Sequence, residues 1–402
     1  MRRKTETLIT RRSILKLSGG AAVAGLGVRA FPMPAIAQGA PLKVGFMLPY
    51  TGTYASLGKM IDNGFRQYVA ELGDKLGGRA VEYVVVDDQA EPSKGPDNMN
   101  KLVEREKVDV VIGTVHSGVA MAMVKIARET NKLLIIPNAG AGAATGPMCA
   151  PNIFRTSFTN WQPCFPMGKV VADDGHKNAM TITWKYAAGE EMVSAFKDGF
   201  GKAGGTVTGE LYVPFPEVEF QSLLTQIAEK KPQAVFAFFA GGGAVKFVRD
   251  YAAAGLKKSI PLYGPGFLTD GTLEAQGEAA EGMKTTLHYA EDLDNAANKK
   301  FREAHQKRFN VEPDVYAVQG YDSAALLAIG MNAVKGDIGA RDTLSKAMQA
   351  ALIDSPRGPI TFSPSRNVVQ NIYLREVRKG KNAYVKVASQ GLADPGAGCR
   401  VA

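Results

Sequence analysis

Hydroxyl-bearing and aromatic side chains gather in two loops that follow short apolar runs in the first third of the chain. In the loop 50–58, the ring of Tyr54 could stack on an apolar ligand, and Ser56 could donate a hydrogen bond to it. Ser117 and Gly118 stand at the start of a predicted helix, whose free N–H groups and partial positive charge favour a carboxylate. We predict ligand contacts in both loops. A surface turn and a simple helix cap are the alternatives.

Two further loops consist largely of small residues. Asn138, Ala139 and Gly140 open the first of them, and the second, 240–243, contains Gly241 and Gly242. Small side chains let backbone N–H groups approach an anion closely, so we predict that these residues line a ligand site. A tight turn before a helix is the alternative for the second loop. The first loop lacks the third glycine of a dinucleotide fingerprint, which argues against a nucleotide cofactor.

Aromatic residues further along the chain are candidates for the opposite wall of the site. Tyr186 follows a predicted strand, and Trp161 and Gln162 lie in a segment rich in polar residues and proline. Phe267 follows Gly266 in a Gly-Pro-Gly-Phe turn. Because strand ends border the crevice of α/β folds, we predict that all five residues lie at the ligand. Packing inside a core is the alternative for each ring.

The sequence contains no constellation typical of an enzyme or a metal centre. The four histidines are far apart, and no Cys-x-x-Cys or His-x-x-His spacing occurs. Gly-x-Ser-x-Gly and P-loop motifs are also missing. We therefore predict a binding protein without catalytic residues, metal or cofactor.

The chain opens with the features of an export signal. Residues 10–16 read Thr-Arg-Arg-Ser-Ile-Leu-Lys, which matches the twin-arginine consensus, and Ala35-Ile36-Ala37 supplies a small-x-small cleavage site. The apolar stretch 17–28 is shorter than the roughly 20 residues that span a bilayer. We predict that residues 1–37 form a twin-arginine signal peptide, cleaved near Ala37, and that the mature chain resides in the periplasm.

The charge of the mature chain is close to neutral. Residues 1–37 hold seven of the 48 Lys and Arg residues and one of the 39 acidic residues, which leaves a net charge of about +3. No basic run suggests a nucleic-acid partner.

Three cysteines occur after the predicted leader. In an oxidising compartment, Cys149 and Cys164 could close a short loop, which would leave Cys399 unpaired. We retain this disulfide and a pair of free thiols as alternatives.

Short apolar runs alternate with helical patterns through most of the chain, and the pattern restarts after residue 178. The predicted strands are 42–48, 81–86, 108–113, 133–137, 179–183, 206–213, 234–239 and 260–263. Two long helical patterns follow at 296–309 and 316–334, and a β-rich tail contains 372–377 and 383–387. About 365 mature residues are too many for one typical core. We predict an α/β fold with two doubly wound parallel-sheet lobes and a cleft between them.

Several short motifs also occur in a characteristic order. They are Lys43-Val44-Gly45, Thr51-Gly52-Thr53-Tyr54, Val111-Ile112-Gly113 before His116-Ser117-Gly118, Ile135-Ile136-Pro137-Asn138-Ala139, Phe154-Arg155-Thr156, Tyr263-Gly264-Pro265 and Tyr316-Ala317. Together they resemble the type I periplasmic solute-binding proteins of ABC transporters, in the branched-chain amino acid (Leu/Ile/Val-type) family. The resemblance covers 41–390 and implies two lobes joined by a three-segment hinge. It implies an N-terminal lobe of 41–158 and 291–354, and a C-terminal lobe of 159–290 and 355–402.

The residues after Gly264-Pro265 bear on the ligand. Amino-acid binders of this family hold the ligand ammonium with an acid that follows a Gly-Pro pair, whereas Gly266-Phe267 stand at this place here. An unpaired buried ammonium costs several kcal/mol, so the substitution argues against an α-amino acid. The segments 186–189 and 287–289 are similar to family members that take aromatic carboxylates. We predict a benzoate-, hydroxybenzoate- or phenylpropanoid-like ligand, with a branched-chain or other amino acid as the alternative.

The resemblance also implies a partner and a role. The protein would deliver its small carboxylate ligand to an ABC transporter permease in the inner membrane, and we expect a monomer. A ligand-presenting partner of a sensor and a periplasmic enzyme are the alternatives from other classes.

Overall fold

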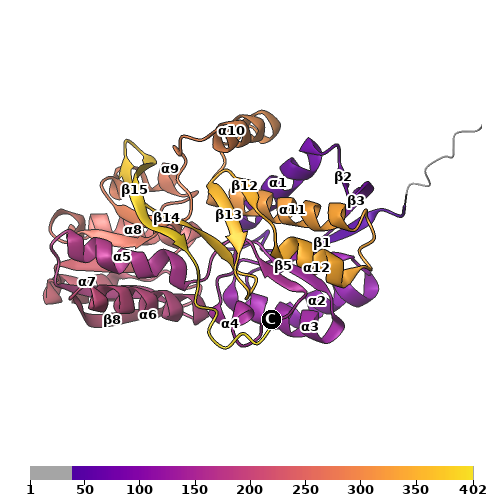
Figure 1. Ribbon diagram of the computed structural model, residues 1–402. Coiled ribbons are helices and arrows are strands. Elements are labelled where there is room, and N and C mark those ends of the chain that lie inside the picture. Colours follow the sequence, from indigo (N-terminus) through magenta and orange to yellow (C-terminus); the bar gives the residue numbers. More distant parts are fainter. Residues whose placement is uncertain (1–38, 402) are drawn as a thin grey trace, which may run out of the picture. The chain divides into compact units, whose positions relative to one another are not determined.

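The computed structural model describes residues 39–401, so the predicted signal peptide lies outside the described residues. Two separate β-sheets, each with helices packed on it, organise this part of the chain (Figure 1). We call the unit built on the six-stranded sheet the first lobe and the unit built on the nine-stranded sheet the second lobe. Within residues 39–401, no helix has the length and low polarity that a membrane span requires.

The first lobe contains the sheet with strand order β2-β3-β1-β4-β5-β6. The strands are β1 (Leu42–Leu48), β2 (Lys75–Leu76), β3 (Arg79–Asp87), β4 (Val110–Gly113), β5 (Leu133–Ile136) and β6 (Ile153–Arg155). Strand β1 runs parallel to β3 and β4, and only the short β2 pairs antiparallel. Every residue of β4 and β5 is buried, as expected for apolar strands that are covered on both faces.

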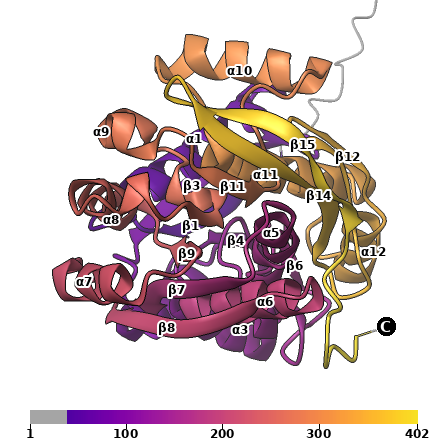
Figure 2. The same cartoon turned by 90° about the vertical axis from the view of Figure 1, so that its left-hand side faces the viewer.

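The second lobe contains the sheet β12-β13-β14-β11-β10-β9-β7-β8, with β15 paired to β14. The strands are β7 (Asn178–Lys185), β8 (Thr206–Pro214), β9 (Ala234–Phe238), β10 (Leu262–Pro265), β11 (Lys284–Leu287), β12 (Ile353–Ser355), β13 (Gly358–Phe362), β14 (Val368–Arg378) and β15 (Lys381–Leu392). Strands β7 to β11 pair in parallel, whereas β11 to β15 pair antiparallel. Figure 2 shows the yellow β14 and β15 beside one another. The sheet is therefore mixed, with a parallel part that borders the site described below.

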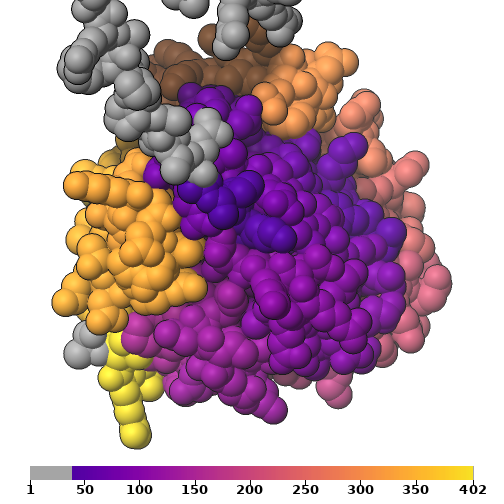
Figure 3. Space-filling model, turned by 90° about the vertical axis from the view of Figure 1, so that its right-hand side faces the viewer, coloured from indigo at the N-terminus to yellow at the C-terminus, as the bar shows by residue number. Residues whose placement is uncertain are grey.

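The helices cover the sheets and join their strands. They are α1 (Ala55–Glu71), α2 (Gly95–Asn100), α3 (Ser117–Thr130), α4 (Gly142–Thr145), α5 (Trp161–Asp173), α6 (Ala187–Lys202), α7 (Gln221–Lys230), α8 (Gly241–Ala253), α9 (Leu273–Gln276), α10 (Ala296–Phe309), α11 (Val315–Ala333) and α12 (Arg341–Gln349). Helices α1 and α11 pack together although they are far apart in sequence. Their close approach depends on glycine, because a Cβ at Gly64 or Gly320 would lie within 2 Å of a carbonyl oxygen of the other helix. In Figure 3, an orange surface of later residues accordingly adjoins the indigo and purple surface of the first third of the chain.

The chain passes between the two lobes three times: after β6, after β11, and between α12 and β12. A buried arginine joins the first and the third of these passages. Arg357 contacts Asp322 of α11 at 2.8 Å and donates to the carbonyl oxygen of Ser157 over 3.0 Å. Asp322 and Arg357 are fully or almost fully buried, so each needs the other as its partner.

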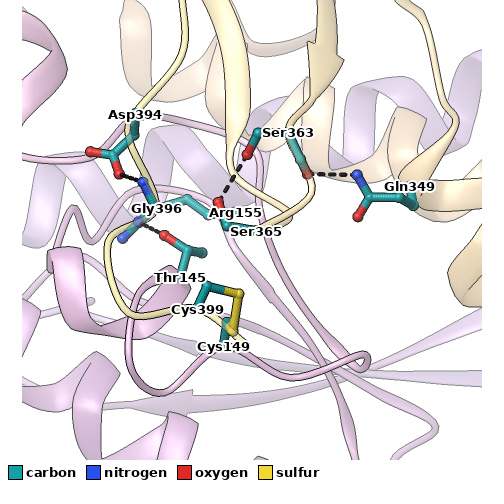
Figure 4. The surroundings of a disulfide bond; sticks show 9 residues. All are labelled: Thr145, Cys149, Arg155, Gln349, Ser363, Ser365, Asp394, Gly396 and Cys399. Atoms are coloured by element: carbon teal, nitrogen blue, oxygen red, sulfur yellow. Dashed lines mark hydrogen bonds between the residues drawn. A yellow bond between two sulfur atoms is a disulfide. The ribbon is translucent and has the colours of Figure 1, made fainter. Parts of the chain in front are cut away.

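Both alternatives that the sequence left open for Cys149 and Cys164 are wrong. Cys149 bonds to Cys399 (Figure 4). Cys164 is a free, buried cysteine of α5. Burial raises the pKa of the Cys164 thiol well above its ordinary value. The physical reason for the correction is the course of the tail. After β15 the chain returns to the first lobe, and Gly398 packs on Pro147 next to Cys149.

Candidate ligand-binding site

A narrow cavity lies between the lobes, where strands of both sheets end. Its free volume is about 20 Å³, room for about one water molecule, so its walls lie close together in this structure. Its lining residues are Tyr54, Leu57, Val115, Ser117, Asn138, Gly140, Phe158, Asn160, Tyr186, Ala188, Met192, Phe238, Ala240, Phe267 and Tyr316. None of these side chains carries a formal charge.

Six helices nevertheless begin at this cavity. The residues at or next to their first positions are Tyr54 (α1), Ser117 (α3), Asn160 (α5), Tyr186 (α6), Ala240 (α8) and Tyr316 (α11). Four of the helices, α1, α5, α6 and α8, have no side chain that caps the first turn. Because a helix N-terminus carries unpaired N–H groups and a partial positive charge, the cavity favours an anion without any basic side chain.

Ser117 supplies a hydrogen-bonding hydroxyl at the start of α3. Its Oγ is buried and has no partner among the described residues. The preceding residue, His116, caps the helix by accepting from the N–H of Gly118 over 3.0 Å. Burial lowers the pKa of His116 to about 4, so the ring is neutral near pH 7 and can act as this acceptor. The N–H of Gly118 is thereby committed to the protein, while the hydroxyl of Ser117 remains free for a ligand.

Two tyrosines close one end of the cavity. The hydroxyl of Tyr54, from the first lobe, lies 2.9 Å from the hydroxyl of Tyr186, from the second lobe. The ring of Tyr186 stacks on His116, with 4.6 Å between ring centroids. Burial raises the pKa of both phenols, so both are protonated and one donates to the other.

Aromatic rings from both lobes form a second wall. Phe267 lies 4.6 Å from Phe158, 6.4 Å from Phe238 and 6.2 Å from Tyr316, measured between ring centroids. The hydroxyl of Tyr316 is buried and has no partner among the described residues. This wall offers ring faces and edges to an apolar ligand, together with one hydroxyl group.

Two asparagines connect the cavity to the surrounding structure. Nδ2 of Asn138 donates to Oε1 of Gln319 over 2.7 Å. Nδ2 of Asn160 donates to Oε2 of Glu191 over 2.7 Å, and the same carboxylate oxygen accepts from the N–H of Gly142 over 3.0 Å. Glu191 belongs to α6 of the second lobe and Gly142 to α4 of the first, so this group ties the two lobes together beside the cavity.

The structure brings some of the residues predicted from the sequence together at the cavity and places the rest elsewhere. Those that line it are Tyr54, Ser117, Asn138, Gly140, Tyr186 and Phe267. Those that do not are Ser56, Gly118, Ala139, Trp161, Gln162, Gly241, Gly242 and Gly266.

Several residues outside the cavity have evident structural roles. Trp161 stacks on Phe165 with 4.6 Å between ring centroids. Gln162 donates to the carbonyl oxygen of Val368 over 3.1 Å and to that of Leu392 over 2.8 Å, and so ties α5 to β14 and β15.

The remaining small residues make close backbone contacts instead. The N–H of Gly242 donates to the carbonyl oxygen of Thr53 over 3.2 Å, and a Cβ at Gly241 would lie 2.2 Å from that oxygen. A Cβ at Gly266 would lie 2.2 Å from the guanidinium of Arg375. Ala139 donates its N–H to the carbonyl oxygen of Thr114 over 2.9 Å. Ser56 is exposed on α1 and makes no contact with the cavity.

Sequence reasoning did not single out nine of the lining residues, although Leu57 and Ala240 lie in loops that it placed at the ligand. The nine are Leu57, Val115, Phe158, Asn160, Ala188, Met192, Phe238, Ala240 and Tyr316. Tyr316 and Asn160 stand at helix starts, a signal that could have been read in the sequence. Phe158 and Phe238 resemble core residues in the sequence, because no local pattern shows that they lie between the two lobes.

Within residues 39–401, no group of three or more His, Cys, Asp or Glu residues is arranged to hold a metal ion.

Comparison with known proteins agrees with this architecture. A family model described as "Periplasmic binding protein" matches residues 41–382. A protein of Brucella melitensis named Leu/Ile/Val-binding protein homolog 6 is 35% identical over 345 residues, which cover 84% of this chain and 88% of that protein.

Two solved structures are also similar. A solute-binding protein of an ABC transporter from R. palustris, in complex with benzoate, is 53% identical, with a TM-score of 0.88 and coverage of 90% of this chain and 99% of the other. A solute-binding protein from Rhodopseudomonas palustris BisB5, in complex with 3,4-dihydroxybenzoic acid, is 34% identical, with a TM-score of 0.84 and coverage of 89% and 99%. With two α/β lobes, an interlobe cavity and a family match over most of its length, the chain belongs to the periplasmic binding protein family.

Proposed function

We propose that the protein is the substrate-binding component of an ABC importer and that its ligand is a small aromatic carboxylate. The observation that carries this proposal is the composition of the cavity. Six helix N-termini meet there, no lining side chain is charged, and aromatic rings form one wall. Such a site favours a negative charge next to an apolar ring.

Each end of an aromatic carboxylate has a match in the cavity. The free hydroxyl of Ser117 and the N-terminus of α3 would receive the carboxylate. Phe158 and Phe267 would pack on the ring. The ligands in the two R. palustris complexes, benzoate and 3,4-dihydroxybenzoic acid, support this class of ligand.

An amino-acid ligand is the second candidate, because a curated relative carries a Leu/Ile/Val-binding name. An α-amino acid would place an ammonium in the cavity, where no lining residue is acidic. The helix N-termini would also repel that charge. We therefore rank this candidate below the aromatic carboxylates.

Ligand capture would proceed by closure of the two lobes, which rotate about the three connections. The first lobe consists of 41–158 and 291–354, and the second consists of 159–290 and 355–402. A ligand that contacts both lobes biases the equilibrium towards the closed form. That form would present the ligand to an inner-membrane permease from the periplasm, without chemical change to the ligand. We infer that a single chain is the working unit, since residues of both lobes of one chain line the cavity.

A thermal-shift panel tests this proposal. Purified protein is heated with benzoate, hydroxybenzoates, cinnamate, leucine and isoleucine, each over a range of concentrations. A ligand present at 100 times its Kd stabilises the protein by about 2.7 kcal/mol. Stabilisation by the benzoates alone is the expected result. Stabilisation by leucine without any response to the benzoates would overturn the ligand assignment. A separate prolonged incubation with benzoate tests for catalysis, and recovery of unchanged benzoate would exclude turnover.

A further inference from the structure

Two asparagines of the cavity turn their amide nitrogens into the protein and leave their amide oxygens unused. Nδ2 of Asn138 donates to Gln319 and Nδ2 of Asn160 donates to Glu191, over 2.7 Å in each case. No described residue donates to Oδ1 of either side chain. Both asparagines are buried and line the cavity. The protein therefore leaves two hydrogen-bond acceptors for a ligand to satisfy.

The neighbour of each asparagine fixes which way its amide points. Glu191 is a carboxylate, which only accepts, so it must face the nitrogen of Asn160 rather than the oxygen. Gln319 is oriented by His288, whose Nε2 lies 3.2 Å from Nε2 of Gln319. Burial holds the pKa of His288 well below its ordinary value, so the neutral ring can accept from Gln319. Oε1 of Gln319 then faces Asn138 and accepts from its nitrogen.

These acceptors set a requirement that a plain carboxylate does not meet. A carboxylate has no hydrogen-bond donor, so it cannot satisfy an amide oxygen, and burial of an unpaired acceptor opposes binding. The required donor is either a hydroxyl group or an ammonium. The helix N-termini around the cavity disfavour the positive charge of an ammonium. A neutral hydroxyl on the ring satisfies the acceptors without that penalty.

Building on the proposed function, we propose that the ligand is a hydroxylated aromatic carboxylate and that Asn138 and Asn160 are its specificity-determining residues. The ring hydroxyl donates to the amide oxygen of one or both asparagines. Benzoate has the same carboxylate and ring but leaves both oxygens unpaired. Selection between the two ligands therefore depends on the asparagines and not on the carboxylate end.

Isothermal titration calorimetry of the wild-type protein gives the first test. Benzoate, 3-hydroxybenzoate, 4-hydroxybenzoate, 3,4-dihydroxybenzoate and leucine are titrated under one set of conditions. We expect at least one hydroxylated benzoate to bind about tenfold or more tightly than benzoate, because a site built for a hydroxyl rejects the analogue that lacks it. Benzoate that binds as tightly as every hydroxylated analogue would overturn this inference and leave the proposed function intact. Binding of leucine alone would overturn both.

Alanine variants test whether Asn138 and Asn160 cause the preference for hydroxybenzoates over benzoate. Asn160→Ala also removes the contact with Glu191, and the effect of that loss does not depend on which ligand binds. The ratio of the benzoate Kd to the hydroxybenzoate Kd isolates the role of the oxygen. We expect this ratio to fall towards one in Asn138→Ala or Asn160→Ala, and to stay at the wild-type value in Asn332→Ala, which changes an exposed asparagine of α11. A wild-type ratio in both cavity variants would contradict the assignment. If neither variant folds, the comparison of benzoate with the hydroxylated benzoates in the wild-type protein decides whether the site selects a ring hydroxyl.

Discussion

The hydroxyl oxygens of Tyr54 and Tyr186 lie 2.9 Å apart, and the two residues belong to different lobes. Each residue stands at the N-cap of its helix, α1 and α6 respectively, so the contact depends on the relative position of two helix ends. Opening of the lobes would separate these hydroxyl groups. The pair is therefore a direct reporter of closure as well as part of the cavity wall.

Tyr54→Phe is expected to weaken ligand binding without loss of the fold. The variant keeps the ring but removes the hydrogen bond to Tyr186 that favours the closed form. One net hydrogen bond corresponds to roughly 0.5–1.5 kcal/mol, so calorimetry should give a Kd about twofold to tenfold higher. Tyr251→Phe is the matched control, because this hydroxyl donates within the second lobe, to Ile260 over 3.0 Å. The control should lower the melting temperature and leave the Kd unchanged, and an equal loss of affinity in both variants would contradict a role in closure.

Ser117→Ala tests the anion end of the site. Its Oγ has no protein partner, so removing it should cost the folded protein little while removing a hydrogen bond to a buried carboxylate. We expect weaker binding by about 1–3 kcal/mol for every aromatic carboxylate, measured by calorimetry. Ser194→Ala, at an exposed serine of α6, provides the comparison and should bind normally. An unchanged Kd in Ser117→Ala would remove this hydroxyl from the ligand site.

The stability of the protein should fall in mild acid because of His116. Its pKa is lowered to about 4 in the folded protein by burial, whereas an unfolded histidine titrates near 6.5. Between these pH values the unfolded state binds more protons than the folded state. The contribution of the neutral His116 ring to the free energy of unfolding is therefore present at pH 7 and is lost as the pH falls. Linkage gives a loss of about 2 kcal/mol between pH 7 and pH 5.

Urea denaturation of wild type and His116→Asn at both pH values checks this contribution. Asparagine keeps a side-chain cap at the start of α3 but does not titrate. The free energy of unfolding of the variant should therefore fall by about 2 kcal/mol less than that of wild type. The same decrease in both proteins would assign the acid sensitivity to other groups.

The disulfide between Cys149 and Cys399 should stabilise the whole chain. It closes a loop across a sequence separation of 250 residues and fastens the tail of the second lobe to the first. Because the disulfide lowers the conformational entropy of the unfolded chain, it should raise the free energy of unfolding by up to about 5 kcal/mol. The melting temperature of wild type should fall when a reducing agent is added. The double variant Cys149→Ser/Cys399→Ser should melt at the lower temperature with or without it, and a wild type that does not respond to reduction would contradict the pairing.

The alternation of strands and helices was readable from the sequence because it depends on local patterns. The helix predicted over 296–309 matches α10, and the strand predicted over 42–48 matches β1. Helix α5 was missed because Pro163 and Pro166 suggested a connecting segment. Pro163 lies in the first turn, where its missing N–H costs nothing, and tertiary packing overrides the second proline.

The site could be predicted only where it follows from local position. Ser117 and Tyr186 stand where a strand gives way to a helix, and this position alone indicated a role at the cleft. The pairing of Asn160 with Glu191, by contrast, depends on how α5 packs against α6. The disulfide partner of Cys149 depends on the return of a tail 250 residues away. Neither relationship leaves a signal in the spacing of residues.

A crystal structure of the protein with 4-hydroxybenzoate would show how the ligand lies between the two lobes. We expect the carboxylate within hydrogen-bonding distance of Oγ of Ser117 and the ring against Phe267. A ligand outside the cavity between the lobes, or one with its carboxylate directed away from the N-terminus of α3, would contradict this expectation.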